Sequence, residues 1–112
     1  MTSRLTAVLI LLVAALLEAG GDAIIRVALR SSAAWNRAAL FTLGAAVLFS
    51  YGLLVNAPPW SFGRLLGLYV VFFFVNAQVI AWLVFRQLPS TPLLFGGALI
   101  VSGGLVIALG NA

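Results

Sequence analysis

Glu18 and Asp22 are the only acidic residues in this 112-residue sequence, and they stand four positions apart inside an apolar stretch. Leu5–Leu17 would supply about 20 Å of helix before Glu18, so this carboxyl is expected within the hydrocarbon of a membrane. An acid there costs at least about 2.5 kcal/mol and is usually kept for function. Since burial favours the neutral acid, such a carboxyl can exchange a proton for a cationic solute, as in a proton-coupled antiporter. A structural glutamate bonded to a neighbouring helix is the alternative.

Arg26 and Arg30 continue the same four-residue spacing, so both acids and both arginines form one stripe on a helix. An acid placed before a base at this spacing favours an ion pair. In one interpretation Asp22 and Arg26 neutralise each other near the membrane surface. In the other, Asp22 is a second titrating group coupled to Glu18.

Polar side chains also occur in the apolar stretch 65–85, where Tyr69, Asn76 and Gln78 are found. Asn76 and Gln78 point about 200° apart around a helix, so at least one should face the interior of a helical bundle. We therefore predict a substrate- or proton-binding site formed by Glu18, Asp22, Tyr69, Asn76 and Gln78. Hydrogen bonding between helices is the structural alternative for the three uncharged residues.

The composition is that of a membrane protein: 64% of the residues are hydrophobic, 7% are charged, and the mean hydropathy is +1.23. Without Cys or His, the chain can form no disulfide, Cys/His metal site, thiol nucleophile or Ser-His-Asp triad. No residue cluster suggests a cofactor or a metal site, and we do not expect an enzyme. The net charge of +4 comes from arginines spread along the chain, which favours lipid headgroups over nucleic acid as the partner.

Four apolar stretches are long enough to cross a hydrocarbon core of about 30 Å as helices. We expect an all-α integral membrane protein, with one four-helix transmembrane domain over residues 1–112 and short loops. The spans are predicted at residues 5–29, 38–55, 65–85 and 93–109. Pro58-Pro59 and the Pro89–Pro92 segment are expected to end helices, and short connections make consecutive helices antiparallel neighbours.

The N-terminal stretch has a second interpretation, because Arg4 followed by Leu5–Leu17 is also typical of a secretory signal. The apolar run continues past Glu18 without a clean cleavage site, which favours a membrane span. Arginine counts on the two sides differ little, so the sequence gives only a weak topological preference.

The fourth span is rich in glycine, with Gly96, Gly97, Gly103 and Gly104 forming two adjacent stripes at a spacing of seven residues. Small residues allow helices in lipid to approach closely. The span carries no charge, and we predict that these four glycines form a dimer interface.

Together these features resemble the small multidrug resistance transporters of the drug/metabolite transporter superfamily. The resemblance covers essentially the whole chain and is carried by Leu17–Asp22 with Arg26, by Gly96–Gly104, and by Gln87 before a proline-bearing turn. It implies a small multidrug resistance-like bundle, a homodimer of antiparallel copies or a heterodimer with a paralogue, and Glu18 as the coupling residue. It also implies export of small organic or hydrophobic cations. Because the chain is compact and shows no targeting sequence, we expect a multi-pass protein of the bacterial inner membrane.

The third span departs from the family pattern at Leu65–Val71, where Tyr69 can stand for the usual aromatic residue but the serine and the glycines that follow it are missing. Two alternatives to cation export therefore stay open. The chain could be a flippase or an accessory subunit for an amphiphilic, lipid-linked substrate that works with a partner chain. It could also be a structural membrane subunit without transport of its own.

Overall fold

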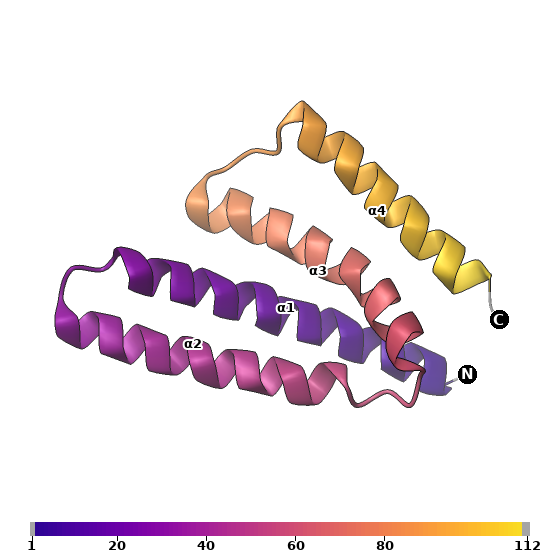
Figure 1. Cartoon of the computed structure of the whole chain (residues 1–112), viewed down its shortest axis with the longest axis horizontal. Coiled ribbons are helices and arrows are strands. Elements are labelled where there is room, and N and C mark those ends of the chain that lie inside the picture. The colour runs from indigo at the N-terminus through magenta and orange to yellow at the C-terminus, as the bar shows by residue number, and fades with distance from the viewer. Residues whose placement is uncertain (1, 111–112) are drawn as a thin grey trace. The chain divides into compact units, whose positions relative to one another are not determined.

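A computed structural model describes residues 2–110, with side chains from residue 5 onward. Within this range the chain forms four helices and no strand: α1 (Thr2–Arg30), α2 (Ala34–Val55), α3 (Phe62–Phe85) and α4 (Thr91–Leu109). Each is long and apolar enough to cross a membrane. The prediction of an all-α protein with four transmembrane helices is therefore confirmed (Figure 1).

Three helices, α2, α3 and α4, end where the predicted spans end, and α1 ends one residue later. All four begin two to four residues earlier than predicted. The early starts have local causes. Trp35, Asn36 and Arg37 form part of the first turns of α2, where unpaired backbone N–H groups can still reach water. Pro92 lies in the first turn of α4 rather than in the preceding loop, because the missing N–H of proline costs nothing there.

Contacts divide the chain into two compact units, Met1–Ala57 and Pro58–Ala112. Each unit is a helical hairpin, α1 with α2 and α3 with α4. The hairpins are described separately below, and the expected single domain stays a prediction.

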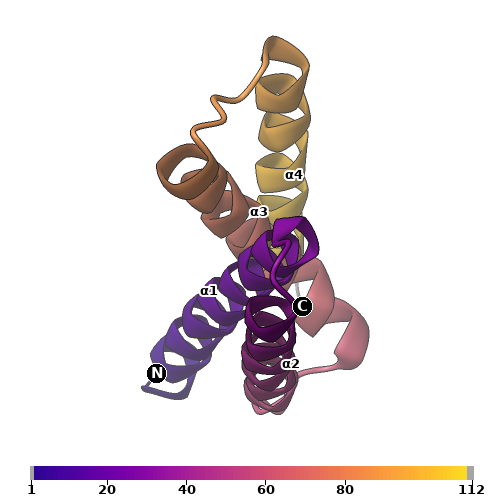
Figure 2. The ribbon, with the colours of Figure 1, turned by 90° about the vertical axis from the view of Figure 1, so that its left-hand side faces the viewer.

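In the first hairpin, α1 and α2 lie side by side and antiparallel (Figures 1 and 2). Two glycines allow this close packing. A Cβ atom at Gly21 would lie 2.7 Å from Leu48, and one at Gly44 would lie 2.6 Å from Ile25. Both distances are too short for a real side chain, so the backbone of each helix packs directly against side chains of the other.

Arg37 stabilises the loop that joins α1 to α2. Its guanidinium donates hydrogen bonds to the carbonyl oxygens of Leu29 (3.2 Å) and Ser31 (3.1 Å) and lies over the ring of Phe41, 5.5 Å from its centroid. These carbonyls belong to the end of α1 and the loop after it, where carbonyl groups have no hydrogen-bond partner within the helix. One arginine of α2 therefore fixes the end of α1.

In the second hairpin, three contacts at glycines join α3 to α4. Gly97 packs against the ring of Phe74, Gly104 against Val71, and Gly67 against Ile107. Two of these glycines come from α4 and one from α3. The contacts follow one face of each helix, as expected for antiparallel neighbours.

The link between α3 and α4 combines an unusual helix end with a regular helix start. Arg86 has a left-handed backbone (φ 57°), and both its N–H and that of Gln87 are donated to the carbonyl of Ala81. Glycine is the usual residue at such a position. Ser90 then begins α4 by accepting a hydrogen bond from the N–H of Leu93.

Candidate functional site

Glu18 lies near the middle of α1. The membrane-length part of this helix runs from Leu5 to Arg30, so about 18–20 Å of helix separate Glu18 from either end. The side chain is partly buried. The position of Glu18 in α1 thus agrees with the prediction that this acid lies deep within a span.

Glu18 belongs to the stripe of α1 that contains Gly21 and Ile25, which contact Leu48 and Gly44 of α2. The stripe alternates steps of four and three residues and comprises Ala7, Leu11, Ala14, Glu18, Gly21, Ile25 and Ala28. Apart from Glu18 and Ile25, its members are buried, with Leu11, Ala14 and Ala28 at 0% exposure. Glu18 is the only member of this stripe that can carry a charge. We call this stripe the α1 seam.

The glycine contacts fix the register of the hairpin and so identify the part of α2 opposite Glu18. Because Gly21 meets Leu48 and Gly44 meets Ile25, the level of Glu18 corresponds to that of Tyr51. Tyr51 lies seven residues after Gly44, on the same face of α2. An aromatic residue with a hydroxyl group therefore lies level with the acid on the neighbouring helix.

Asp22 lies one turn beyond Glu18, but outside the α1 seam. Its side chain is exposed, as are those of Arg26 and Arg30. Within residues 5–110, Asp22 takes part in no ion pair. The interpretation in which Asp22 and Arg26 neutralise each other is therefore not supported by the described side chains, although both residues occupy the stripe that their spacing predicts.

The three candidate residues of α3 fall on two faces of that helix. Gln78 continues the α4-facing positions Gly67, Val71 and Phe74, and it lines a hollow of about 250 Å³ together with residues of the following loop and of α4. The hollow is lined by Phe74, Val75, Gln78, Val79, Pro89, Leu93, Leu94 and Gly97. Gln78 is thus placed between α3 and the beginning of α4.

Tyr69 and Asn76 lie on another face of α3, turned away from α4. Tyr69 is buried, and its ring centroid lies 6.4 Å from that of Phe73. Asn76 donates its side-chain amide to the carbonyl of Phe72 at 2.9 Å, one turn earlier in its own helix. This bond satisfies a donor of Asn76 without a neighbouring helix. The carbonyl oxygen of its side chain can serve as an acceptor.

The candidate site therefore divides between the hairpins. Glu18 and Asp22 belong to the first and Tyr69, Asn76 and Gln78 to the second. Within each hairpin the helices hold these residues at defined positions. Among the described residues, no three acidic, His or Cys side chains come together as a metal site would need.

The four glycines of α4 also divide into two pairs. Gly97 and Gly104 pack against Phe74 and Val71 of the same chain, whereas a Cβ atom at Gly96 or Gly103 would meet nothing within 4 Å. Within the described residues, one glycine stripe is thus used inside the hairpin. The stripe of Gly96 and Gly103 is open and remains the predicted dimer face.

Sequence reasoning assigned no role to Gly21, Gly44 or Arg37, although they set the geometry of the first hairpin. A signal for Gly21 was present: it lies three residues after Glu18, on the same helical face. Arg37 gave no such signal, since an arginine beside an apolar span is common.

In the search for relatives, no family model, curated protein or solved structure matches this chain.

Proposed function

We propose that this chain is a small membrane transporter that exchanges protons for small organic cations at Glu18. The observation that supports this most is the place of Glu18: near the middle of a membrane-length helix, in a seam otherwise made of small and apolar residues. A carboxylate at such a depth is costly. A transport role explains its retention better than a structural role does, since alanine and glycine fill the neighbouring positions of the seam.

The exchange follows from the chemistry of one carboxyl group. In its protonated form Glu18 is neutral and has no electrostatic attraction for a cation. When the proton leaves to water, the carboxylate can pair with a cation that has entered from the same side. Because one group holds either a proton or a cation, binding of one requires release of the other.

Access from both membrane sides requires a second structural element. We include in the proposal a dimer of two copies, or of this chain with a paralogue, joined through the open face of Gly96 and Gly103 on α4. Two inverted copies would act like the inverted repeats of longer transporters. The resemblance to small multidrug resistance transporters also supports a bacterial inner membrane as the location.

Proton release on cation binding tests the proposal. Tetraphenylphosphonium is added to the purified protein in weakly buffered detergent solution, and the pH change is recorded. We expect the native protein to release protons and Glu18→Gln to release none. Asp22→Asn is the matched control, since it removes the other carboxyl one turn away, and it should still release protons.

Two outcomes would contradict the proposal. One is an absence of proton release from native protein whose helical circular dichroism is intact. The other is release that persists in Glu18→Gln. The first result would favour a membrane subunit that carries no cations, and the second would place the exchange at a residue other than Glu18.

A second candidate function is supported by the outer stripe of α1. Asp22, Arg26 and Arg30 are exposed along one side of the helix, where arginines can bind the phosphate of an amphiphilic, lipid-linked molecule. A flippase or accessory subunit would use this stripe with a partner chain. This alternative would be favoured if Arg26→Gln abolished movement of such a lipid-linked molecule across the membrane and left cation-induced proton release unaffected.

A further inference from the structure

The face of α1 that carries the charged residues changes from buried to exposed along the helix. Ala15 and Ala19 are 0% and 5% exposed. Asp22 and Arg26 lie seven residues, about two turns, after these alanines and therefore on the same face, yet both are exposed. Glu18 lies beside Ala19, one turn before Asp22, and is partly buried. The carboxyl of Glu18 thus lies at the boundary between a buried part and an exposed part of α1.

The exposed part of this face lies within the membrane span. The span runs to Arg30, so about 12 Å of helix separate Asp22 from its end and about 6 Å separate Arg26 from it. Ionisable side chains at such a depth face protein or a water-filled cavity, because hydrocarbon cannot solvate them. Among the described residues Asp22 has no ion-pair partner. Its carboxylate therefore requires solvation from outside the described chain.

Water is the occupant that fits the charges of this face. Asp22 is negative, whereas Arg26 and Arg30 are positive. An acyl chain would leave all three unsolvated, and a phosphate would satisfy the arginines but be repelled by Asp22. Water donates hydrogen bonds to a carboxylate and accepts them from a guanidinium. Because the charged side chains recur every four residues, about 6 Å of helix rise, each step from the end of the span has its own polar group.

On the other side of Glu18 the helix offers no such route. Leu11 and Ala14 are 0% exposed, as Ala15 is, and no charged or polar residue occurs between Thr6 and Glu18. Water that approached Glu18 from the N-terminal end of α1 would have to pass buried, apolar positions.

We propose that Asp22, Arg26 and Arg30 line a water-filled path that connects Glu18 with the membrane surface at the Arg30 end of α1. Toward the N-terminal end of α1 this path is closed. The path deepens the proposed exchange and rests on it, because the proton of Glu18 is what travels along it. It specifies the membrane side to which that proton leaves in the described conformation.

Thiol labelling tests the path, and the chain suits this experiment because it contains no cysteine. Single cysteines are placed in the full chain in lipid vesicles, and a water-soluble methanethiosulfonate reagent is supplied on both sides of the membrane. Because the reactive thiolate forms in water and not in hydrocarbon, we expect Asp22→Cys and Arg26→Cys to react about ten-fold faster than Val27→Cys. Val27 is the matched control, since it is 43% exposed and lies next to Arg26 but on another face of α1.

Two further comparisons locate the path and its closed side. Ala15→Cys and Ala19→Cys should react as slowly as Val27→Cys. Capping Arg26→Cys with a bulky thiol reagent should slow the proton release that tetraphenylphosphonium causes, whereas capping Val27→Cys should leave it unchanged. Circular dichroism verifies that each variant is helical. The labelling rates do not depend on transport, so failure of the path and failure of the exchange at Glu18 are distinguishable.

Three results would overturn the proposal. Equal labelling rates for Asp22→Cys and Val27→Cys would show that water does not reach this face. Rapid labelling of Ala15→Cys would show that the path is also open toward the N-terminal end. Slow labelling of Asp22→Cys and Arg26→Cys that becomes rapid when the protein is dissociated in detergent would show that a second copy covers the face.

Discussion

The two hairpins contain the same number of membrane-length helices but are joined in different ways. In the first, the α1 seam includes Glu18 and is buried except at Glu18 and Ile25, with Gly21 and Gly44 allowing close packing on both sides. In the second, three contacts at glycines join α3 to α4, and a hollow of about 250 Å³ lies beside Gln78. Both acids of the chain belong to the first hairpin, and α4 carries no charge.

This difference indicates that the two hairpins have different roles. A closely packed seam holds a carboxyl in a fixed place, which an exchange site needs. The second hairpin presents apolar faces and an open glycine stripe, which suit contacts with lipid or another chain. The following substitutions test this comparison, and their expected effects decrease from the first to the last.

Gly21→Leu should have the largest effect, because a leucine side chain would have to fit where Leu48 and Val47 already lie. Overpacking of this kind lowers the free energy of unfolding by about 3 kcal/mol. The measurement is an unfolding titration with sodium dodecyl sulfate in mixed micelles, followed by tryptophan fluorescence. Gly20→Leu is the matched control, since a Cβ atom at Gly20 meets nothing within 4 Å. Equal stability of the two variants would contradict the described packing.

Gly97→Leu should weaken the second hairpin by about 2 kcal/mol, less than Gly21→Leu, because α3 and α4 share fewer close contacts and can separate. The clash is with the ring of Phe74, 2.6 Å from the added Cβ atom. In the same titration, Gly96→Leu should leave the unfolding free energy unchanged. Because Gly96 is proposed to lie in the dimer interface, this variant should instead lower the apparent mass in detergent. If Gly96→Leu were less stable than Gly97→Leu, the stripe of Gly96 and Gly103 would be the one that packs against α3.

Arg37→Ala should lower the free energy of unfolding by about 1 kcal/mol, because it removes two charged hydrogen bonds that are partly accessible to water. Hydrogen exchange should rise at the amides of the last turn of α1 and of its loop. Arg30→Ala serves as the control, since this exposed arginine lies close by in the sequence. An identical exchange pattern in both variants would show that Arg37 does not hold the end of α1.

Arg86→Gly should have the smallest effect and should stabilise the second hairpin by up to about 1 kcal/mol. Glycine adopts the left-handed backbone at this position without steric cost. Gln87→Gly, one residue later, should give no such gain. Destabilisation by Arg86→Gly would show that the arginine side chain itself is needed at the end of α3.

The sequence predicts the helices well because the need to cross the membrane determines their lengths. Residues 38–55, 65–85 and 93–109 are predicted as spans, and α2, α3 and α4 end at those last residues. The helix starts are less predictable. Asn36 and Pro92 are typical of turns in most contexts, yet each lies in a first helical turn here.

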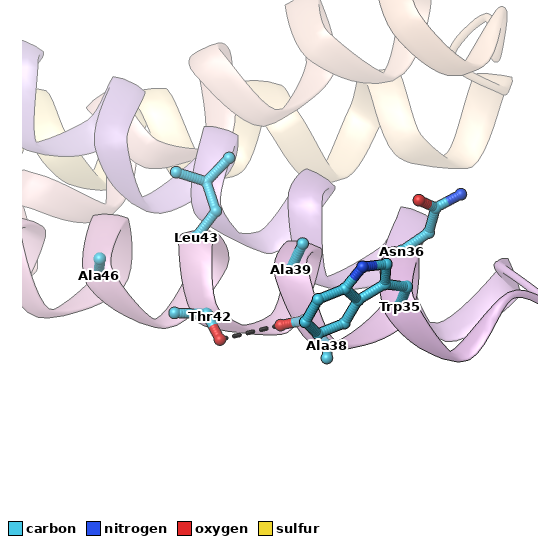
Figure 3. A pocket seen from close by; sticks show the side chains of 7 residues that line it. All are labelled: Trp35, Asn36, Ala38, Ala39, Thr42, Leu43 and Ala46. Carbon is cyan, nitrogen blue, oxygen red and sulfur yellow. Dashed lines mark hydrogen bonds between the residues drawn. The ribbon is translucent and has the colours of Figure 1, made fainter.

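The candidate site is predictable only in part. The depth of Glu18 follows from counting residues, but its place in the seam depends on contacts of Gly21 and Gly44 that a single sequence does not contain. The glycine pairs of α4 show the same limit, because adjacent stripes look alike until Phe74 and Val71 are found against one of them. A hollow of about 600 Å³ on α2, lined by Trp35, Ala39, Thr42 and Ala46 among others (Figure 3), had no sequence signal, since alanines in an apolar span are common.

Uptake into proteoliposomes tests most directly whether Glu18 couples protons to cations. Vesicles with an acidic interior are mixed with labelled tetraphenylphosphonium, and uptake is compared with that of protein-free vesicles. We predict gradient-dependent uptake by the native protein and by Asp22→Asn, and only the protein-free rate for Glu18→Gln. Uptake by Glu18→Gln at the native rate, or native uptake that persists after the proton gradient is collapsed, would contradict this assignment.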